Sequence, residues 1–159
     1  MPLNRDFIGR EYPAGETYEV SRELIRRFAQ AIGDNSPAYT DVDAAKALGY
    51  PDVIAPPTFL TVLTFRYAAE GPVVDPGLGL NYALVVHGEQ KFVHHRPVRA
   101  GDVLTVTSSV VDIRDAGRNE LMTTKTSVAT TEGEPVADLF GTLVSRGTAA
   151  GKPEGESPA

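Results

Sequence analysis

The three histidines have the most readily recognised chemistry in this sequence, because an imidazole can bind a metal ion or act as a general base near neutral pH. His94 and His95 are adjacent and lie in a run that is typical of a strand. Neighbouring residues of a strand point to opposite faces, so these two rings cannot readily share one ion. His87 has no partner at metal-ligand spacing. The sequence therefore predicts ordinary strand histidines and no metal site.

Two further kinds of site are disfavoured by composition and by a short motif. None of the 159 residues is a cysteine, which excludes disulfides, thiolate metal sites and a cysteine nucleophile. The glycine pair in Gly77-Leu78-Gly79-Leu80 lacks the preceding strand and following helix of a phosphate-binding loop. It predicts a flexible turn instead. We expect no cofactor.

The formal net charge of -6 restricts the partners of the chain. Nucleic acid is not an expected partner, because its binding needs a clustered basic face. An acidic carrier protein or the phosphates of coenzyme A would need a local basic patch, for which Lys91, Arg96 and Arg99 are candidates. No stretch resembles a signal peptide or approaches the roughly 20 apolar residues of a membrane span. We expect a cytoplasmic protein without membrane contact.

The segment from Asp34 to Thr40 combines short polar side chains with turn formers, which predicts an ordered loop. The residues alone allow a purely structural interpretation of this loop. Asp34 and Asn35 can be turn and cap residues, and Tyr39 can be a packing residue with a satisfied hydroxyl group. A chemical role for the loop depends on the elements around it.

Hydrophobic spacing predicts the elements that must hold this loop. The sequence indicates a strand over 12–20, a helix of about twelve residues between the N-cap Ser21 and Gly33, and a short helix between Asp41 and Gly49. From Thr58 to about Glu70, apolar side chains surround most of a further helix, which predicts that this helix is buried.

The second half of the chain is rich in valine, threonine, leucine and phenylalanine, which favours strands near 82–95, 103–114, 120–131 and 135–146. Turn sequences between the last three predict antiparallel strands in sequence order, and a break in the alternation predicts a bulge near Val110. The expected fold class is α+β, with a single domain over 1–146 in which an antiparallel sheet wraps around a buried central helix. Residues 147–159 are expected to form a disordered tail. Unpaired sheet edges favour dimerisation.

A motif in the first half of this sequence resembles that of a known family. The stretch from Phe28 to Asp41, followed by Ala44, Gly49 and Val53-Ile54-Ala55, resembles the hydratase-2 motif of the MaoC family of (R)-hydratases and dehydratases. In active members of that family an aspartate is followed five residues later by a histidine, and an Ile-Ala-His-Gly segment opens the central helix. The resemblance extends over roughly residues 5–146 and implies a hot-dog fold acting on acyl thioesters.

The reaction explains why this family needs such residues. Moving water across a double bond conjugated to a thioester requires one group that orients or deprotonates water and another that exchanges the α-proton. The enolate charge that develops on the thioester oxygen also needs a backbone donor. The resemblance assigns these roles to the aspartate, the histidine and an N–H group at the start of the central helix.

This sequence departs from the family pattern at two places. Asp34 matches the aspartate, but Tyr39 occupies the histidine position, and a tyrosine with a pKa near 10 is a weak base that can still donate a hydrogen bond. In Ala55-Pro56-Pro57, two prolines replace the His-Gly pair. Where Pro57 takes the glycine position, the N–H expected to stabilise the enolate is absent.

These departures predict a subunit that binds an acyl thioester but does no catalysis alone. The pattern from Leu48 to Phe59 is similar to the accessory subunits of actinobacterial two-subunit (3R)-hydroxyacyl-ACP dehydratases. The resemblance implies a heterodimer with a catalytic hot-dog subunit, in fatty-acid metabolism, and an acyl-CoA or acyl carrier protein thioester as ligand. The residues expected to line the acyl site are Asn35, Tyr39, Pro57, Thr58, Phe59 and Val62.

Two other functions remain open. The chain can be an autonomous homodimeric (R)-specific enoyl-CoA hydratase that uses Asp34 with a displaced base, such as Tyr39 or a histidine. It can also be a non-enzymatic acyl-CoA binding module. A hot-dog thioesterase is disfavoured, because Glu70, the only carboxylate near the buried helix, lies at its far end.

Overall fold

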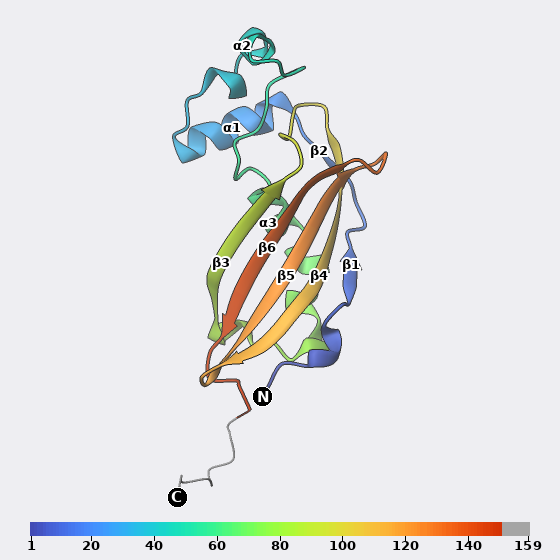
Figure 1. The fold of residues 1–159 in the computed structure, drawn as a ribbon, viewed down its shortest axis with the longest axis vertical. Coiled ribbons are helices and arrows are strands. Elements are labelled where there is room, and N and C mark those ends of the chain that lie inside the picture. Colours follow the sequence, from blue (N-terminus) through green and yellow to red (C-terminus); the bar gives the residue numbers. More distant parts are fainter. Residues whose placement is uncertain (151–159) are drawn as a thin grey trace, which may run out of the picture.

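Four long strands from the second half of the chain form most of a six-stranded antiparallel sheet in the computed structural model, which describes residues 1–150 (Figure 1). The strand order is β1-β4-β5-β6-β3, and β2 also pairs with β4. The strands are β1 (Glu11–Pro13), β2 (Tyr18–Glu19), β3 (Val85–His94), β4 (Val103–Ala116), β5 (Asn119–Thr130) and β6 (Pro135–Ser145).

The strand predictions are confirmed for the three hairpin-linked strands. β4, β5 and β6 pair in sequence order, and the register shifts between Val110 and Asp112, where the alternation breaks. One feature differs from the prediction, because the first strand is divided into β1 and β2. The pairing of β3 with β6 at the sheet edge is a feature for which the sequence made no prediction. The connection 95–102 is long enough to cross from one edge of the sheet to β4.

The helices and 3-10 turns come mostly from the first half of the chain. They are η1 (Arg5–Phe7), α1 (Arg22–Ile32), η2 (Pro37–Tyr39), α2 (Val42–Ala47), α3 (Thr61–Arg66), η3 (Ala68–Glu70), η4 (Pro72–Val74), η5 (Pro76–Leu78) and η6 (Tyr82–Leu84). The predicted ends of α1 are confirmed, since the Ser21 hydroxyl accepts a hydrogen bond from Leu24 N, and Gly33 adopts a left-handed conformation. The Asp41 carboxylate caps α2.

The central helix α3 is shorter than predicted and is buried on one side only. It has six residues, and 3-10 turns continue the path of the chain after it. Phe59, Leu60, Leu63 and Tyr67 are buried in the core, whereas the side chain of Phe65 is 78% exposed. The apolar composition predicts a helix that is buried on all sides. A further layer of protein over the exposed side of α3 would be needed to bury it in this way.

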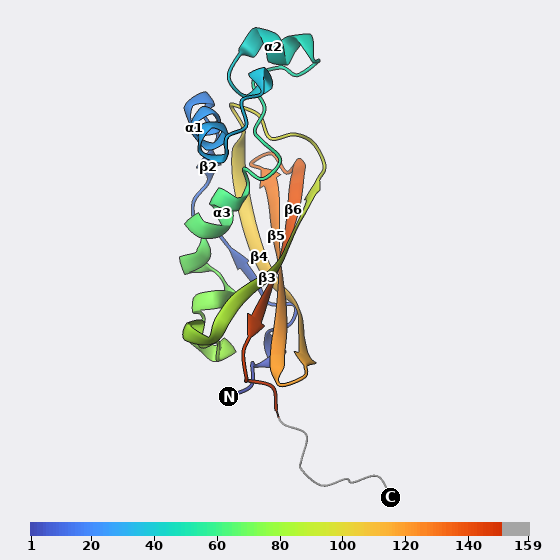
Figure 2. The same cartoon turned by 90° about the vertical axis from the view of Figure 1, so that its left-hand side faces the viewer.

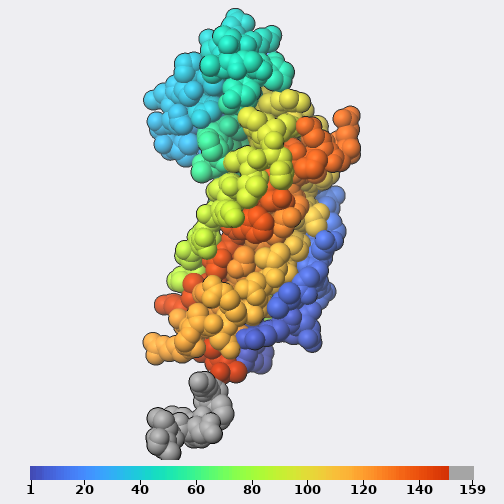
Figure 3. Space-filling view, viewed as in Figure 1, coloured from blue at the N-terminus to red at the C-terminus, as the bar shows by residue number. Residues whose placement is uncertain are grey.

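The helices α1 and α3 and the turns after α3 lie on one face of the sheet, whereas α2 lies beyond one end of it (Figure 2). The main core lies between α3, the end of α1 and the inner faces of β4, β5 and β6, and a smaller apolar cluster around Leu78 and Met122 closes the other end. Strands β5 and β6 lie open to the viewer on the opposite face (Figure 3). Together these features confirm the α+β hot-dog fold.

The end of the described chain folds back onto the β4–β5 turn. Gly147 N donates to the Asn119 side chain, and Ala149 N donates to Arg118 O. The predicted tail boundary at residue 147 remains a prediction, and residues 151–159 lie outside the described part of the chain.

Candidate functional site

The loop after α1 holds Asp34 in a fixed turn. The left-handed Gly33 turns the chain, and Asp34 N donates to Ala29 O at 3.0 Å. The Asp34 carboxylate in turn accepts a bond from Ser36 N at 3.3 Å. This local bonding is the turn role expected of the residue type, and it leaves the second carboxylate oxygen for other contacts.

Tyr39 lies beside Asp34 at the end of the same loop. The 3-10 turn over Pro37–Tyr39 brings the half-buried ring against the main core. Burial raises the pKa of the Tyr39 hydroxyl, and the negative charge of Asp34 and a hydrogen-bonding interaction with it raise the pKa further. The hydroxyl is therefore held protonated at neutral pH, as a donor rather than a base.

The segment that opens α3 is bonded directly to this loop. Ile54 N donates to Ala38 O at 3.1 Å, one residue before Tyr39. Ala55 N donates to Val98 O at 2.7 Å, so this segment is also tied to the connection between β3 and β4. Pro56 is buried and Pro57 is exposed, and neither proline has an N–H to offer a ligand. The structure thus brings the two parts of the sequence motif together.

His94 also lies at this site, although the sequence predicts an ordinary strand histidine at this position. Its ring nitrogen Nε2 lies 2.8 Å from Pro57 O, which can only accept, so Nε2 is the donor. The Phe92 ring stacks on the imidazole with a centroid distance of 6.0 Å. The sequence gives no signal for this contact, because it joins the end of β3 to a segment 37 residues earlier.

The remaining predicted site residues divide into an exposed and a buried group. Asn35 and Thr58 are exposed, Val62 is half-buried, and Phe59 is buried with an edge contact to the Phe28 ring at 5.4 Å. Because Pro57 lacks an N–H, the next backbone donor along the chain is the N–H of Thr58. A ligand at this site would meet polar groups at the surface and apolar side chains along α3.

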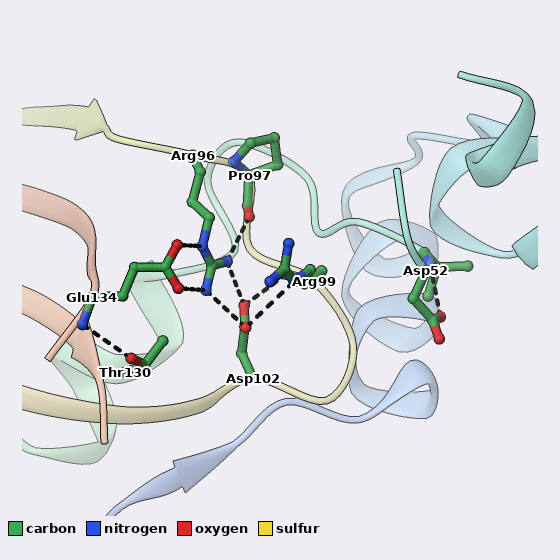
Figure 4. A network of polar contacts seen from close by, with 8 residues as sticks. Asp52, Arg96, Pro97, Arg99, Asp102, Thr130 and Glu134 are labelled. Carbon is green, nitrogen blue, oxygen red and sulfur yellow. Dashed lines mark hydrogen bonds and ion pairs between the residues drawn. The ribbon is translucent and has the colours of Figure 1, made fainter. Parts of the chain in front are cut away.

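A nearly buried ion-pair network fixes the connection that supports the α3 opening (Figure 4). The Arg96 guanidinium donates twice to Asp102 at 2.9 Å and also binds Glu134. The Asp102 carboxylate also accepts a hydrogen bond from Arg99 N at 2.9 Å. Asp102 raises the pKa of Arg96 further above its already high ordinary value. Through Ala55 and Val98, this network holds the backbone of the candidate site.

Arg96 and Arg99 therefore do not form the basic patch suggested by the sequence. Both guanidinium groups face Asp102, so their charges are compensated within the chain. Lys91 lies over the Phe140 ring, at 5.7 Å from its centroid. A phosphate-bearing ligand would need other cations.

The other candidates from the sequence take separate positions. His95 Nε2 lies 3.1 Å from the Asp138 carboxylate, so the two adjacent histidines have different partners. His87 contacts Gln90, and Glu70 binds Gly15 N. Within residues 1–150, no group of three or more histidine or acidic side chains could hold a metal ion. In the same part of the chain, no helix has both the length and the hydropathy needed to cross a membrane.

Similarity to known proteins is found in sequence and in structure. Residues 6–139 match the family described as the FAS1-like dehydratase domain region. A UPF0336 protein of Saccharopolyspora erythraea is 54% identical over 156 residues, which cover 98% of this chain and 99% of that protein.

Two solved structures combine a similar fold with appreciable sequence identity. A chain of the C-terminally truncated HadBC (3R-hydroxyacyl-ACP dehydratase) complex from Mycobacterium tuberculosis has a TM-score of 0.77 and 29% identity, covering 89% of this chain and 99% of that one. A MaoC-like dehydratase has a TM-score of 0.78 and 32% identity, covering 88% of this chain and 42% of the other. These matches confirm the resemblance seen in the sequence motif.

Proposed function

Because this chain belongs to the FAS1-like dehydratase domain region family, we propose that it is the acyl-thioester-binding, non-catalytic subunit of a heteromeric (R)-3-hydroxyacyl-ACP or hydroxyacyl-CoA dehydratase. The family and the fold support a role in hydration or dehydration. The HadBC protein of similar fold is itself a complex, which supports assembly with a second hot-dog subunit.

One observation carries the non-catalytic part of the proposal. The loop of Asp34 and the opening of α3 are bonded to each other through Ile54 and Ala38, yet they present Tyr39 and Pro57 where the reaction needs a base and a backbone donor. The two segments are held together, so a displaced loop explains the absence of the base and of the backbone donor less well. The residue types at positions 39 and 57 explain it better. The raised pKa of Tyr39 makes this hydroxyl a poor base at neutral pH.

The same residues are suited to binding. The protonated Tyr39 hydroxyl can donate to a thioester or hydroxyl oxygen, and Asn35 and Thr58 offer further polar groups at the surface. The half-buried Val62 supplies apolar contact for an acyl chain, and Phe59, which is buried, belongs to the apolar core behind this surface. Pro57 would shape the entrance without donating a hydrogen bond.

An unpaired edge and exposed apolar side chains support a partner subunit. β3 ends the sheet with ten residues, most of them exposed, and an edge of this length favours pairing with another strand. Phe65, Val74, Tyr82 and Val86, here called the apolar strip, are exposed on α3, on the turns after it and on β3. A hot-dog partner that pairs with β3 would cover them and the open side of α3.

The test is hydration of an enoyl-CoA by the purified chain, alone and with the hot-dog protein encoded beside it. The chain alone is expected to be inactive, and the pair is expected to be active. Robust turnover by the isolated chain would refute the non-catalytic role. A catalytic partner whose activity and affinity do not change on mixing would refute the subunit role.

The position of His94 favours a second candidate, an autonomous homodimeric (R)-specific enoyl-CoA hydratase. Its imidazole lies at the α3 opening, and with Nε2 donating to Pro57 O, Nδ1 is the nitrogen that can accept a proton. In that case Asp34→Asn and His94→Gln would each abolish turnover by the isolated chain. His87→Gln, which changes a surface histidine of the same strand, is the control and would retain the rate.

A further inference from the structure

The end of the molecule opposite α1 and α2 has a hollow that contains two arginines. It has a volume of about 620 Å³ and is lined by Leu84, Arg118, Asn119, Arg146, Gly147 and Ala149. Arg118 comes from the β4–β5 turn, and Arg146 follows directly after β6. No carboxylate lines the hollow among the residues that the structure describes, although the whole chain carries a net charge of -6.

Backbone contacts fix both arginine-bearing segments. Ala149 N donates to Arg118 O at 3.2 Å, which ties the chain after β6 to the β4–β5 turn. Arg146 N and Nε both donate to Leu84 O at 3.1 Å. This contact uses one donor of the Arg146 guanidinium and leaves its two terminal amino groups for a ligand.

The side chains of the hollow are rich in donors. Within residues 1–150 neither Arg118 nor Arg146 forms an ion pair. The Asn119 Oδ1 atom already accepts Gly147 N, so the side-chain amino group of Asn119 is a third donor. Two guanidinium groups and an amide match a ligand with several anionic oxygens, and guanidinium binds phosphate through paired hydrogen bonds. We propose that Arg118 and Arg146 form a binding site for a phosphate group.

The source of the phosphate rests on the proposed function. Coenzyme A and the prosthetic arm of an acyl carrier protein both carry phosphate, and Arg96 and Arg99 are already paired with Asp102. The hollow begins at Leu84, directly before the exposed edge strand β3. If two hot-dog subunits pair at this edge about a two-fold axis, their edge strands run antiparallel. The start of β3, where the hollow lies, then faces the acyl-site end of the edge strand in the other subunit. The phosphate of a thioester bound there lies toward Arg118 and Arg146.

The experiment is calorimetric titration of the full chain, alone and with its partner subunit, using inorganic phosphate, coenzyme A and a phosphate-free acyl-pantetheine. Coenzyme A is expected to bind, and Arg118→Gln and Arg146→Gln are each expected to weaken it by about tenfold or more. Arg27→Gln, at an exposed arginine of α1, is the control and leaves affinity unchanged. Arg118→Gln keeps the Leu84 contact of Arg146, and thermal melting verifies the fold of each variant.

The outcomes separate this site from the proposed function. In one outcome, inorganic phosphate and coenzyme A bind with equal affinity, and the arginine variants weaken the binding of both. This result supports the site and identifies free phosphate as its ligand. Binding that does not change in the double variant, or no binding of either compound, overturns the site. Acyl-pantetheine lacks phosphate, so its binding tests the acyl role alone and is expected to be the same in the arginine variants.

Discussion

At the scale of single residues, Tyr39 determines what the site can do. A tyrosine at this position supplies a donor, and both its burial and the neighbouring Asp34 charge oppose loss of its proton. The family motif matches Asp34 and Tyr39 to its two catalytic positions, but only the fold shows that the Tyr39 hydroxyl is also shielded by the core. Tyr39 therefore gives this loop a hydrogen-bond donor in place of the base that the resemblance implies.

The raised pKa of Tyr39 leads to a prediction about pH. The neutral hydroxyl is favoured in the folded state, so its contribution to stability is fully present below about pH 10, the ordinary tyrosine pKa, and is lost as the pH rises through the higher folded value. Ultraviolet titration of tyrosinate, taken as the difference between wild type and Tyr39→Phe, is expected to place the Tyr39 transition above pH 10.

Asp34→Asn provides the matched comparison. The asparagine oxygen can still accept Ser36 N, while the negative charge beside Tyr39 is removed. The Tyr39 transition is expected to move to lower pH in this variant. A Tyr39 that ionises at or below pH 10 in the wild type, or at the same pH in both proteins, would contradict the proposed burial and charge effects.

At the scale of elements, the sequence predicts those that are specified by local signals. Ser21, Gly33 and Asp41 define α1 and α2 through caps, and the hairpin turns and the bulge near Val110 follow from residue type and alternation. The site loop belongs to this predictable part, because its ends are the ends of two capped helices.

Other features depend on contacts between distant segments and could not be predicted. α3 begins later than its apolar residues indicate, because Pro56 and Pro57 are followed by turn-like bonds to Pro56 O and Thr58 O before the helix starts. The His94 contact with Pro57 and the position of β3 beside β6 join residues far apart in sequence. Spacing along the chain carries no information about such pairs.

The Arg96 network gives a prediction at this scale. Arg96→Met keeps much of the aliphatic packing but leaves the nearly buried Asp102 carboxylate without its main partner, which is expected to cost about 2 kcal/mol of unfolding free energy. Arg114→Met removes an exposed pair with Asp112 and is expected to cost less than about 0.5 kcal/mol. Urea unfolding measures both values. Equal losses in the two variants would show that the network does not stabilise the 95–102 connection.

At the scale of the whole molecule, α3 is buried on one side only in the isolated chain. Phe65 on α3 is 78% exposed, and Tyr82, which precedes β3, is 74% exposed. Apolar side chains at a sheet edge are typical of an interface rather than of a monomer surface. The second subunit proposed above would cover α3 and would also supply the catalytic groups that Tyr39 and Pro57 do not offer.

Phe65→Glu tests this explanation without disturbing the fold. The side chain is exposed, so the unfolding free energy of the isolated chain is expected to change by no more than about 0.5 kcal/mol. A carboxylate buried without a partner at an interface is costly, so association with the partner subunit, or with a second copy, is expected to weaken by about tenfold or more. Sedimentation velocity over a range of concentrations measures both kinds of association.

Leu48→Glu is the matched control, because Leu48 is also an exposed apolar residue but follows α2, away from the β3 edge. If both variants associate like the wild type, the apolar strip is not the interface, and the exposure of α3 needs another cause.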